Sequence, residues 1–211
     1  MKKFIVSLII LIILAGVGFY FGWIQIQLSA NEYGVIFTKT GGWEEEVIKP
    51  GDFTWRITRL LPTNLSLYTY QIETKQITVS SEGELPSASL YSTYIEGNPD
   101  LSYSFRLDLS YSLDPAYLPS LAQGEKILPD DLETYYASFT DRFSIEAENF
   151  IRNFMSDFNS ADAETVLNFS EINQGLMDHL TELFPQLEIN SVRLINANIP
   201  DINLYQQARA T

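Results

Sequence analysis

The chain lacks cysteine altogether and contains a single histidine, His179, among its 211 residues. The absence of cysteine excludes disulfide bonds, a thiol nucleophile and cysteine-ligated metal ions. One imidazole is also too few for the histidine cluster that usually holds a metal. The sequence therefore predicts neither a metal site nor a cofactor.

Basic residues are scarce, because 13 lysines and arginines stand against 27 aspartates and glutamates, giving a net charge of −14. The imbalance is uneven: residues 25–81 carry five basic and six acidic side chains, whereas residues 82–188 carry four and twenty. A surface this negative repels nucleic acid and anionic lipid, so nucleic-acid binding is excluded. We interpret the acidity as a solvated surface that promotes solubility, with an interaction role as the alternative.

Recognisable catalytic motifs are missing as well. There is no Gly-x-Ser-x-Gly elbow, and Gly41-Gly42 lacks the Lys-Ser/Thr pair of a phosphate-binding loop. His179 lies off the apolar stripe of its segment, which predicts an exposed helix residue rather than a catalytic base. We expect a protein that is not an enzyme. A hydrolase with His179 beside a serine and a carboxylate is the most distant alternative.

A long apolar run is present only at the start of the chain. Lys2 and Lys3 precede the run, which begins at Phe4 and extends to Trp23, and no further charge follows until Glu32. At about 1.5 Å per helical residue, this run spans roughly the 30 Å of a bilayer's hydrocarbon core. Tyr20 and Trp23 fall where aromatic side chains favour the membrane interface. Residues 1–24 are therefore predicted to form a cytoplasmic tip and a transmembrane anchor.

A cleaved signal peptide is the alternative interpretation of this run. The run is longer than a usual signal h-region, and the best small-residue site, Leu28-Ser29-Ala30, has a bulky leucine where a small side chain is needed. We therefore favour a retained anchor. The positive-inside bias of the two lysines places the N-terminus in the cytoplasm and the chain from about residue 25 outside it. The prediction is a single-pass membrane protein whose main domain is extracytoplasmic, and periplasmic if the protein is bacterial.

The remaining sequence is rich in strand patterns first and helix patterns later, which predicts an α+β fold with an antiparallel β meander and packed helices. One domain is expected over residues 25–200, followed by the start of a C-terminal helix over 201–211. Residues 82–89 are expected to form a loop, and a turn is expected at Gly97-Asn98-Pro99-Asp100. Strands are predicted near residues 33–37, 44–48, 53–57, 65–69, 77–79, 90–95, 101–113 and 187–199.

Three of these segments carry strong periodic patterns. Apolar residues occupy every second position from Leu101 to Leu113, as in a strand with one buried face. The final strand changes phase near Ser191, where a bulge fits the pattern. Capping residues are expected at Asp130 or Asp131, at Ser160-Ala161-Asp162 and at Ser170-Glu171. The two main helices have apolar stripes made of Leu132, Tyr135, Tyr136, Phe139, Phe143, Phe150, Phe154 and Phe158, and of Ile172, Leu176, Leu180 and Leu183.

Four short segments resemble the SPFH (band 7) family of stomatins, prohibitins, flotillins and bacterial modulators of a membrane-bound AAA protease, and the modulators are the nearest branch. The first two are residues 31–37 (Asn-Glu-Tyr-Gly-Val-Ile-Phe) and residues 47–55 (Val-Ile-Lys-Pro-Gly-Asp-Phe-Thr-Trp). The third is a strand that runs into an Asp-Pro-x-Tyr step over residues 107–117. The fourth, over residues 189–205, is a strand that ends in Ile-Pro-Asp before a Leu-Tyr helix start.

The resemblance implies a non-catalytic scaffold at a membrane surface that oligomerises, with itself or with SPFH paralogues, and organises or regulates membrane proteins. Its implied partners are the lipid bilayer and a membrane-bound protease. Family members usually continue into a long coiled coil, whereas this sequence ends at Thr211 where that helix would begin. Oligomer size is therefore left open. A different class, an anchored or secreted extracytoplasmic sensor for a lipid or small ligand, is the alternative.

One segment is a candidate for membrane-surface contact. Residues 54–61 mix aromatic, aliphatic and basic side chains, a combination that suits a bilayer interface. An ordinary strand with two surface arginines is the alternative. The candidate contact residues are Trp55, Arg56, Arg59, Leu60 and Leu61.

Overall fold

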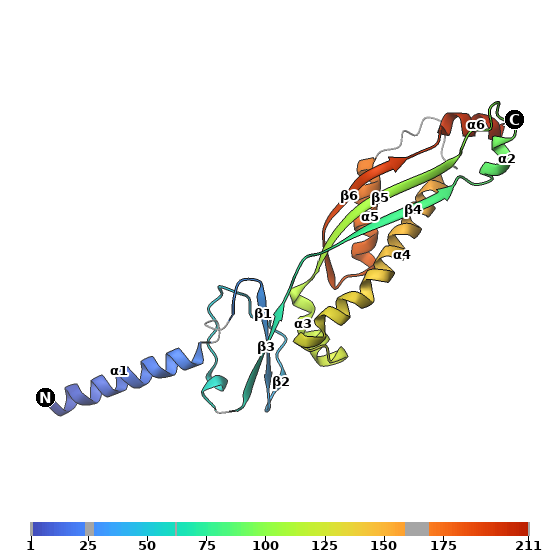
Figure 1. Ribbon diagram of the computed structural model, residues 1–211. Coiled ribbons are helices and arrows are strands. Elements are labelled where there is room, and N and C mark those ends of the chain that lie inside the picture. Colours follow the sequence, from blue (N-terminus) through green and yellow to red (C-terminus); the bar gives the residue numbers. More distant parts are fainter. Residues whose placement is uncertain (1, 24–27, 62, 159–168, 211) are drawn as a thin grey trace. The chain divides into compact units, whose positions relative to one another are not determined.

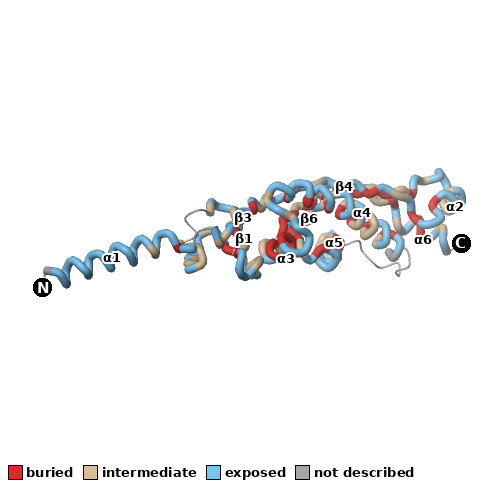
Figure 2. Tube along the Cα trace, turned by 90° about the horizontal axis from the view of Figure 1, so that it is seen from below, coloured by how far each residue is buried: buried red, intermediate tan, exposed pale blue. Residues whose placement is uncertain are grey.

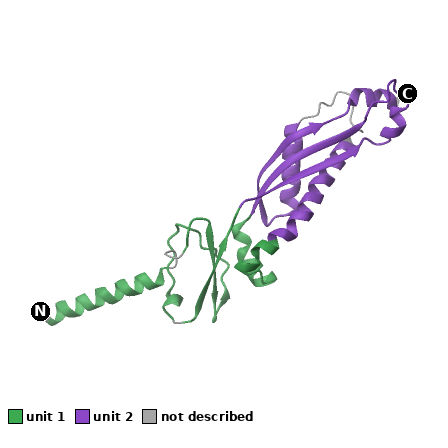
Figure 3. Ribbon diagram, in the orientation of Figure 1, with its two compact units in different colours: residues 1–73, 113–135 green, residues 74–112, 136–211 purple. Residues whose placement is uncertain are grey.

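The computed structural model describes residues 2–23, 28–61, 63–158 and 169–210 (Figure 1). Its fold is α+β, with an N-terminal apolar helix and antiparallel sheets, as the sequence predicts. The helix is exposed along most of its length, whereas buried residues concentrate in the sheets and in the helices that cover them (Figure 2). The chain divides into two compact units, residues 1–73 with 113–135 and residues 74–112 with 136–211 (Figure 3).

The first unit contains the apolar helix α1 (Lys2–Gly22) and a sheet of strand order β2-β1-β3. Strands β1 (Glu32–Thr38), β2 (Gly42–Trp43) and β3 (Leu65–Gln71) are antiparallel. Ile36 and Ile48 form the centre of a small core that Leu28, Leu65 and Leu67 cover. The other elements are short helices: η2 (Ile57–Leu60), η3 (Pro115–Tyr117), α3 (Leu118–Ser120), η4 (Leu121–Glu125) and η5 (Pro129–Asp131).

Two strand predictions in this unit are confirmed and two are wrong. Strands β1 and β3 lie at residues 33–37 and 65–69 as expected. Residues 44–48 form no strand, and only Ile48 makes an isolated bridge, to Gly34. Residues 53–57 also form no strand, because Trp55 bridges to Trp23 at the end of α1 and η2 begins at Ile57. The apolar alternation there reflects packing on a helix, as described below.

The second unit is a three-stranded sheet of order β4-β5-β6, formed by β4 (Lys75–Glu84), β5 (Ser102–Leu113) and β6 (Leu187–Asn198). Two long helices, α4 (Leu132–Phe158) and α5 (Phe169–Leu183), lie along the sheet (Figure 1). The ring of Tyr111 on β5 contacts the ring of Phe143 on α4, with 4.7 Å between centroids. Helix α2 (Ala88–Ser92) packs against α6 (Ile202–Ala210).

The strongest strand prediction is confirmed. From position 101 to 113, every second side chain is buried, as expected for one face on a core. The turn before it is confirmed by positive φ angles at Gly97 (+93°) and Asn98 (+46°). The phase change in β6 is confirmed by consecutive exposed residues at Asn190 and Ser191.

Residues 90–95 are not a strand, because the chain forms α2 there. Tyr91 packs edge-on against the ring of Tyr205 at 5.5 Å, and Ala88 is buried, so contact with α6 outweighs the local strand propensity. Residues 82–84 also differ from the loop prediction, since they extend β4. Their pairing with residues 102–104 of β5 supplies the backbone hydrogen bonds that a loop would lack.

Both main helices are present, but their buried stripes differ from the predicted ones. In α4, burial passes from Phe143 to Ala147, Ile151 and Met155, while Phe150 and Phe154 are partly exposed. In α5, Phe184 just beyond the helix is buried, and Leu183 is exposed. Burial continues in four-residue steps from Phe143, whereas the predicted stripe jumps seven residues to Phe150 and so follows a neighbouring face of the helix. Ser170 lies inside α5 and is not its cap, and residues 160–162 and the side chain of Phe158 lie outside the described part of the chain.

Candidate membrane-interface site

Helix α1 is the first component of the candidate site. Residues Lys3–Gly22 are long and apolar enough to cross a membrane, and of this stretch the rest of the chain buries Gly22 alone. A signal sequence at the N-terminus has the same properties. The predicted anchor residues Lys2, Lys3, Phe4 and Tyr20 all lie in α1, and Trp23 follows its last residue. The exposed side chains of Phe4 and Tyr20 lie near opposite ends of a helix about 32 Å long.

The end of α1 is held by the segment that contains Trp55. The Arg56 backbone N–H donates to the carbonyl oxygen of Gly22 at 3.1 Å, and Trp23 forms an antiparallel bridge with Trp55. A Cβ atom built on Gly22 would lie 2.2 Å from Nε1 of Trp55. The indole therefore rests on the bare helix backbone, a close approach that only glycine permits.

An aromatic cluster extends this contact. The ring of Phe53 stacks on that of Phe19 in α1, with 5.7 Å between centroids and 20° between planes. Phe53 also lies 5.8 Å from the ring of Trp23. Phe53 is nevertheless exposed, so the cluster shows an apolar surface to its surroundings. Such offset stacking adds about 0.5–1.5 kcal/mol beyond area burial.

Beyond Trp55, the chain turns into η2, which contacts α1 and exposes apolar side chains. Ile57 is 67% exposed and Leu61 is 58% exposed, and Leu60 between them is also exposed. Together with the exposed rings of Phe19, Tyr20, Phe21 and Phe53, these side chains add apolar surface beside the end of α1. Contiguous apolar surface of this kind marks an interaction site for a membrane or a protein.

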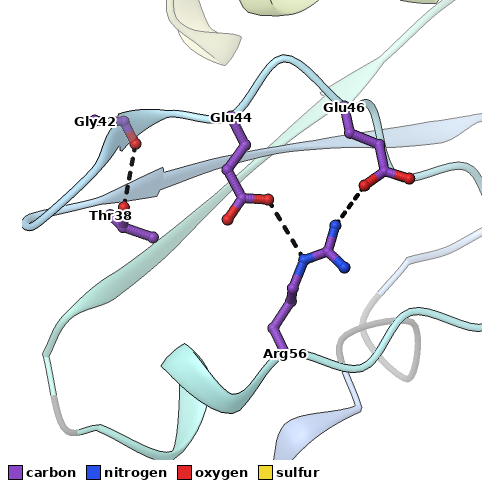
Figure 4. Close-up of polar contacts among 5 residues, drawn as sticks. All are labelled: Thr38, Gly42, Glu44, Glu46 and Arg56. Carbon is purple, nitrogen blue, oxygen red and sulfur yellow. Dashed lines mark hydrogen bonds and ion pairs between the residues drawn. The ribbon is translucent and has the colours of Figure 1, made fainter.

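The two arginines of the segment have different surroundings. Arg56 forms ion pairs with Glu44 and Glu46, at 3.5 Å and 2.5 Å (Figure 4). Thr38 closes the turn before Glu44 by donating its hydroxyl to the carbonyl oxygen of Gly42. For Arg59, the buried Nη1 atom has no hydrogen-bond partner among the described residues. One arginine is therefore neutralised within the domain, and the other is not.

Sequence reasoning named Trp55, Arg56, Arg59, Leu60 and Leu61, and the structure places all five on one continuous segment beside α1. It missed three contributors from the same junction, namely Gly22, Phe19 and Phe53. The apolar run contains Gly16, Gly18 and Gly22, and a Cβ on either of the first two would meet nothing within 4 Å. No sequence signal separates Gly22 from the others, so its role emerges only from the contact with Trp55.

His179 lies on α5 with its ring 5.4 Å from that of Phe150, and it is partly buried rather than exposed as predicted. Elsewhere, burial raises the pKa of Tyr70 to about 12, and its hydroxyl donates to the carbonyl oxygen of Ile127. Among the residues that the structure describes, no group of three or more histidines or carboxylates is placed to hold a metal ion.

Two surface hollows among the described residues have linings that mix polar and apolar side chains. One of about 450 Å³ is lined by Glu82, Glu84, Ser102, Ser104 and other residues of the second unit. Another, of about 240 Å³, is lined by Glu45, Lys49, Asp114 and their neighbours in the first. Small-ligand sites are usually enclosed, whereas both of these hollows are open to solvent.

No protein-family model matches this chain. An uncharacterized protein of Treponema pallidum (strain Nichols) is 27% identical to it over 192 residues. The similar region covers 89% of this chain and 64% of the relative, so the chain spans slightly less than two thirds of that protein's length. The similarity extends over nearly the whole chain and brings no function with it.

Proposed function

We propose that the chain is a non-catalytic, membrane-anchored scaffold of SPFH type. It oligomerises at the membrane, with itself or with SPFH paralogues, and organises or regulates membrane proteins such as a membrane-bound protease. The observation that carries this proposal is the junction at Gly22, where Trp55 and Phe53 pack directly on the end of α1. An apolar helix that continues into the packing of a folded domain holds that domain against the bilayer.

The orientation follows from the two ends of α1. Lys2 and Lys3 stay in the cytoplasm under the positive-inside rule, so the folded units lie on the extracytoplasmic side. Because η2 contacts α1, the segment lies at the depth of the lipid headgroups. Ile57, Leu60 and Leu61 then enter the outer edge of the hydrocarbon.

Packing around the candidate cleavage site supports a retained anchor. Leu28 packs on the small core of Ile36 and Ile48. The backbone N–H of Ser29 donates to the carboxylate of Glu32 at 2.8 Å. Cleavage after Ala30 would remove Leu28 from this core and Trp23 from its bridge to Trp55. Retention of residues 1–30 preserves these contacts of the folded domain.

The segments that resemble the SPFH family have definite structural roles, which supports the scaffold proposal. Residues 31–37 overlap β1, the central strand of the first sheet. Asp114 of the Asp-Pro-x-Tyr step caps η3 by accepting from the Ala116 N–H at 2.9 Å. Asp201 of the Ile-Pro-Asp step caps α6 by accepting from the Leu204 N–H at 3.1 Å. Each aspartate satisfies a backbone donor at a helix start, which fixes where the chain changes direction.

The test is the size of the full chain in a mild detergent, measured by light scattering. A scaffold is expected to give a high-order oligomer, with a mass well above twice the 24.0 kDa chain mass, that persists on dilution. The mass of the purified chain measured at the same time reports whether residues 1–30 are retained. A monomer or dimer would contradict the scaffold and favour the sensor alternative. A chain that begins after Ala30 would contradict the anchor.

A further inference from the structure

We propose that Arg59, assisted by the hydroxyl of Thr58, binds the phosphate group of a phospholipid beside the end of α1. This inference rests on the proposed function, because it requires η2 to lie at the headgroups. It adds a ligand class and named ligand-binding atoms to that surface. The evidence is an unusual concentration of polar atoms without partners.

Buried polar side-chain atoms almost always have a hydrogen-bond partner, and each exception needs an explanation. In the described part of the chain, four such atoms lack one: Trp55 Nε1, Thr58 Oγ1, Arg59 Nη1 and Asn173 Oδ1. Three of the four lie within five consecutive residues, in the segment that contacts α1. All three atoms carry a hydrogen that they can donate. The segment therefore presents donors that the chain itself does not satisfy.

Trp55 Nε1 has a separate explanation, since the indole nitrogen faces Gly22 and is covered by α1. Thr58 and Arg59 lie on η2 itself, and both residues are partly exposed even though these two atoms are covered. An external acceptor can approach the exposed part of these side chains from the surface, and rotation about their side-chain torsions brings the two covered donors to it. It cannot reach the Trp55 nitrogen without displacing the helix.

The acceptor must be anionic, because Arg59 is a permanent cation. Among the described residues, no ion pair involves Arg59, whereas the neighbouring Arg56 is neutralised by Glu44 and Glu46. A partly buried guanidinium without a counter-charge is costly. Its planar fork of donors matches the oxygens of a phosphate and binds two of them at once.

A lipid is a better source of this phosphate than free solution. Ile57 precedes Thr58 and Arg59, and Leu60 and Leu61 follow them, and all three apolar side chains are exposed. They offer contact to an acyl chain while the guanidinium holds the headgroup, as amphipathic segments do at interfaces. Free phosphate would gain nothing from these side chains, so it should bind more weakly than a lipid that carries the same group.

The test uses the full chain in dodecyl maltoside micelles, with thermal unfolding followed during three titrations. The additives are dioleoylphosphatidylglycerol, dioleoylglycerol, which lacks the phosphate, and inorganic phosphate. We expect only the phospholipid to raise the unfolding midpoint. Arg59→Gln should raise the half-saturating lipid fraction by about 10- to 100-fold, because a charge-assisted hydrogen bond is lost. Arg193→Gln, which removes the same charge from an exposed position of β6, is the matched control and should titrate like the wild type.

Two further variants keep the proposal testable if Arg59→Gln does not fold. Arg59→Lys retains the charge without the fork and should weaken binding less than Arg59→Gln, and Thr58→Val should weaken it by about 2- to 10-fold. Lipid dependence that is unchanged in these variants would overturn the proposal. So would an equal response to dioleoylglycerol or to inorganic phosphate. Oligomer size is measured on the same samples, so a failed scaffold and a failed lipid site give different results.

Discussion

The contact between Gly22 and Trp55 gives the sharpest prediction about how α1 is joined to the domain. In Gly22→Ala, the new methyl carbon would lie 2.2 Å from Nε1 and 2.5 Å from Cε2 of the indole. Optimal contacts between non-bonded heavy atoms are about 3.5–4.0 Å, so the ring must move by more than about 1 Å. Trp55 is bound to the end of α1 through its bridge to Trp23, and a displaced indole therefore loosens the whole junction.

The expected cost is about 1–3 kcal/mol, the usual penalty for an added methyl group in a packed contact. Alanine also stabilises a helix relative to glycine by up to about 1 kcal/mol, which opposes the effect. Gly18→Ala is the matched control, because its Cβ meets no atom within 4 Å and the change occurs in the same helix. The difference between the two variants isolates the clash with Trp55. A cost of 1–3 kcal/mol corresponds to roughly 5- to 150-fold in the opening equilibrium.

Hydrogen exchange of the full chain in micelles measures this opening directly. The Arg56 N–H donates to the carbonyl oxygen of Gly22, so its exchange reports separation of residues 53–61 from α1. We expect this amide to exchange roughly 5- to 150-fold faster in Gly22→Ala than in Gly18→Ala. A smaller ring in the double variant Gly22→Ala/Trp55→Leu should restore part of the protection. Equal exchange in the two single variants would refute the packing argument.

Two further predictions concern the folded units. Phe143→Ala should lower the free energy of unfolding by about 3–5 kcal/mol, because Phe143 is fully buried against Tyr111. Ile145→Ala, at an exposed position of the same helix, should change it by less than about 0.5 kcal/mol. Urea denaturation of the two variants and the wild type measures both changes. Burial raises the pKa of Tyr70 from 10.0 to about 12, so the unfolded chain loses this proton first and stability should fall as pH rises from 10 to about 12. Tyr70→Phe should flatten that fall in alkaline denaturation, and a slope equal to that of the wild type would show that other groups cause it.

The sequence predicts a strand well where only one of the strand's two faces packs against the core. The alternation over residues 101–113 is unambiguous because β5 lies between two strands and its buried apolar side chains all occupy alternate positions, on one face of the sheet. Residues 90–95 are rich in strand-forming residues, yet they fold as α2 and turns because Tyr91 contacts Tyr205 more than 100 positions later in the chain. Local strand propensity carries no information about a contact with a residue so far along the chain.

The candidate site was predictable in composition but not in geometry. Trp55, Arg59 and the leucines indicate an interface through their residue types alone. Arg56 is neutralised by Glu44 and Glu46, which lie twelve and ten positions earlier in the sequence. These glutamates reach Arg56 only when the chain folds back. The same folding leaves Arg59 as the arginine with an unsatisfied donor. Charge pairing thus separates two arginines that look equivalent in the sequence.

The wrong strand prediction at residues 53–57 has a specific physical cause. Alternation of apolar and polar residues reports an extended segment buried on one side, and it does not identify what buries that side. Here Phe53 and Trp55 point toward α1, and a helix end offers one bridging residue, Trp23, instead of a strand ladder. Ile57 continues the alternation but is exposed. An alternating segment with no sheet partner, in a chain with an unburied apolar helix, is therefore a candidate for contact with that helix.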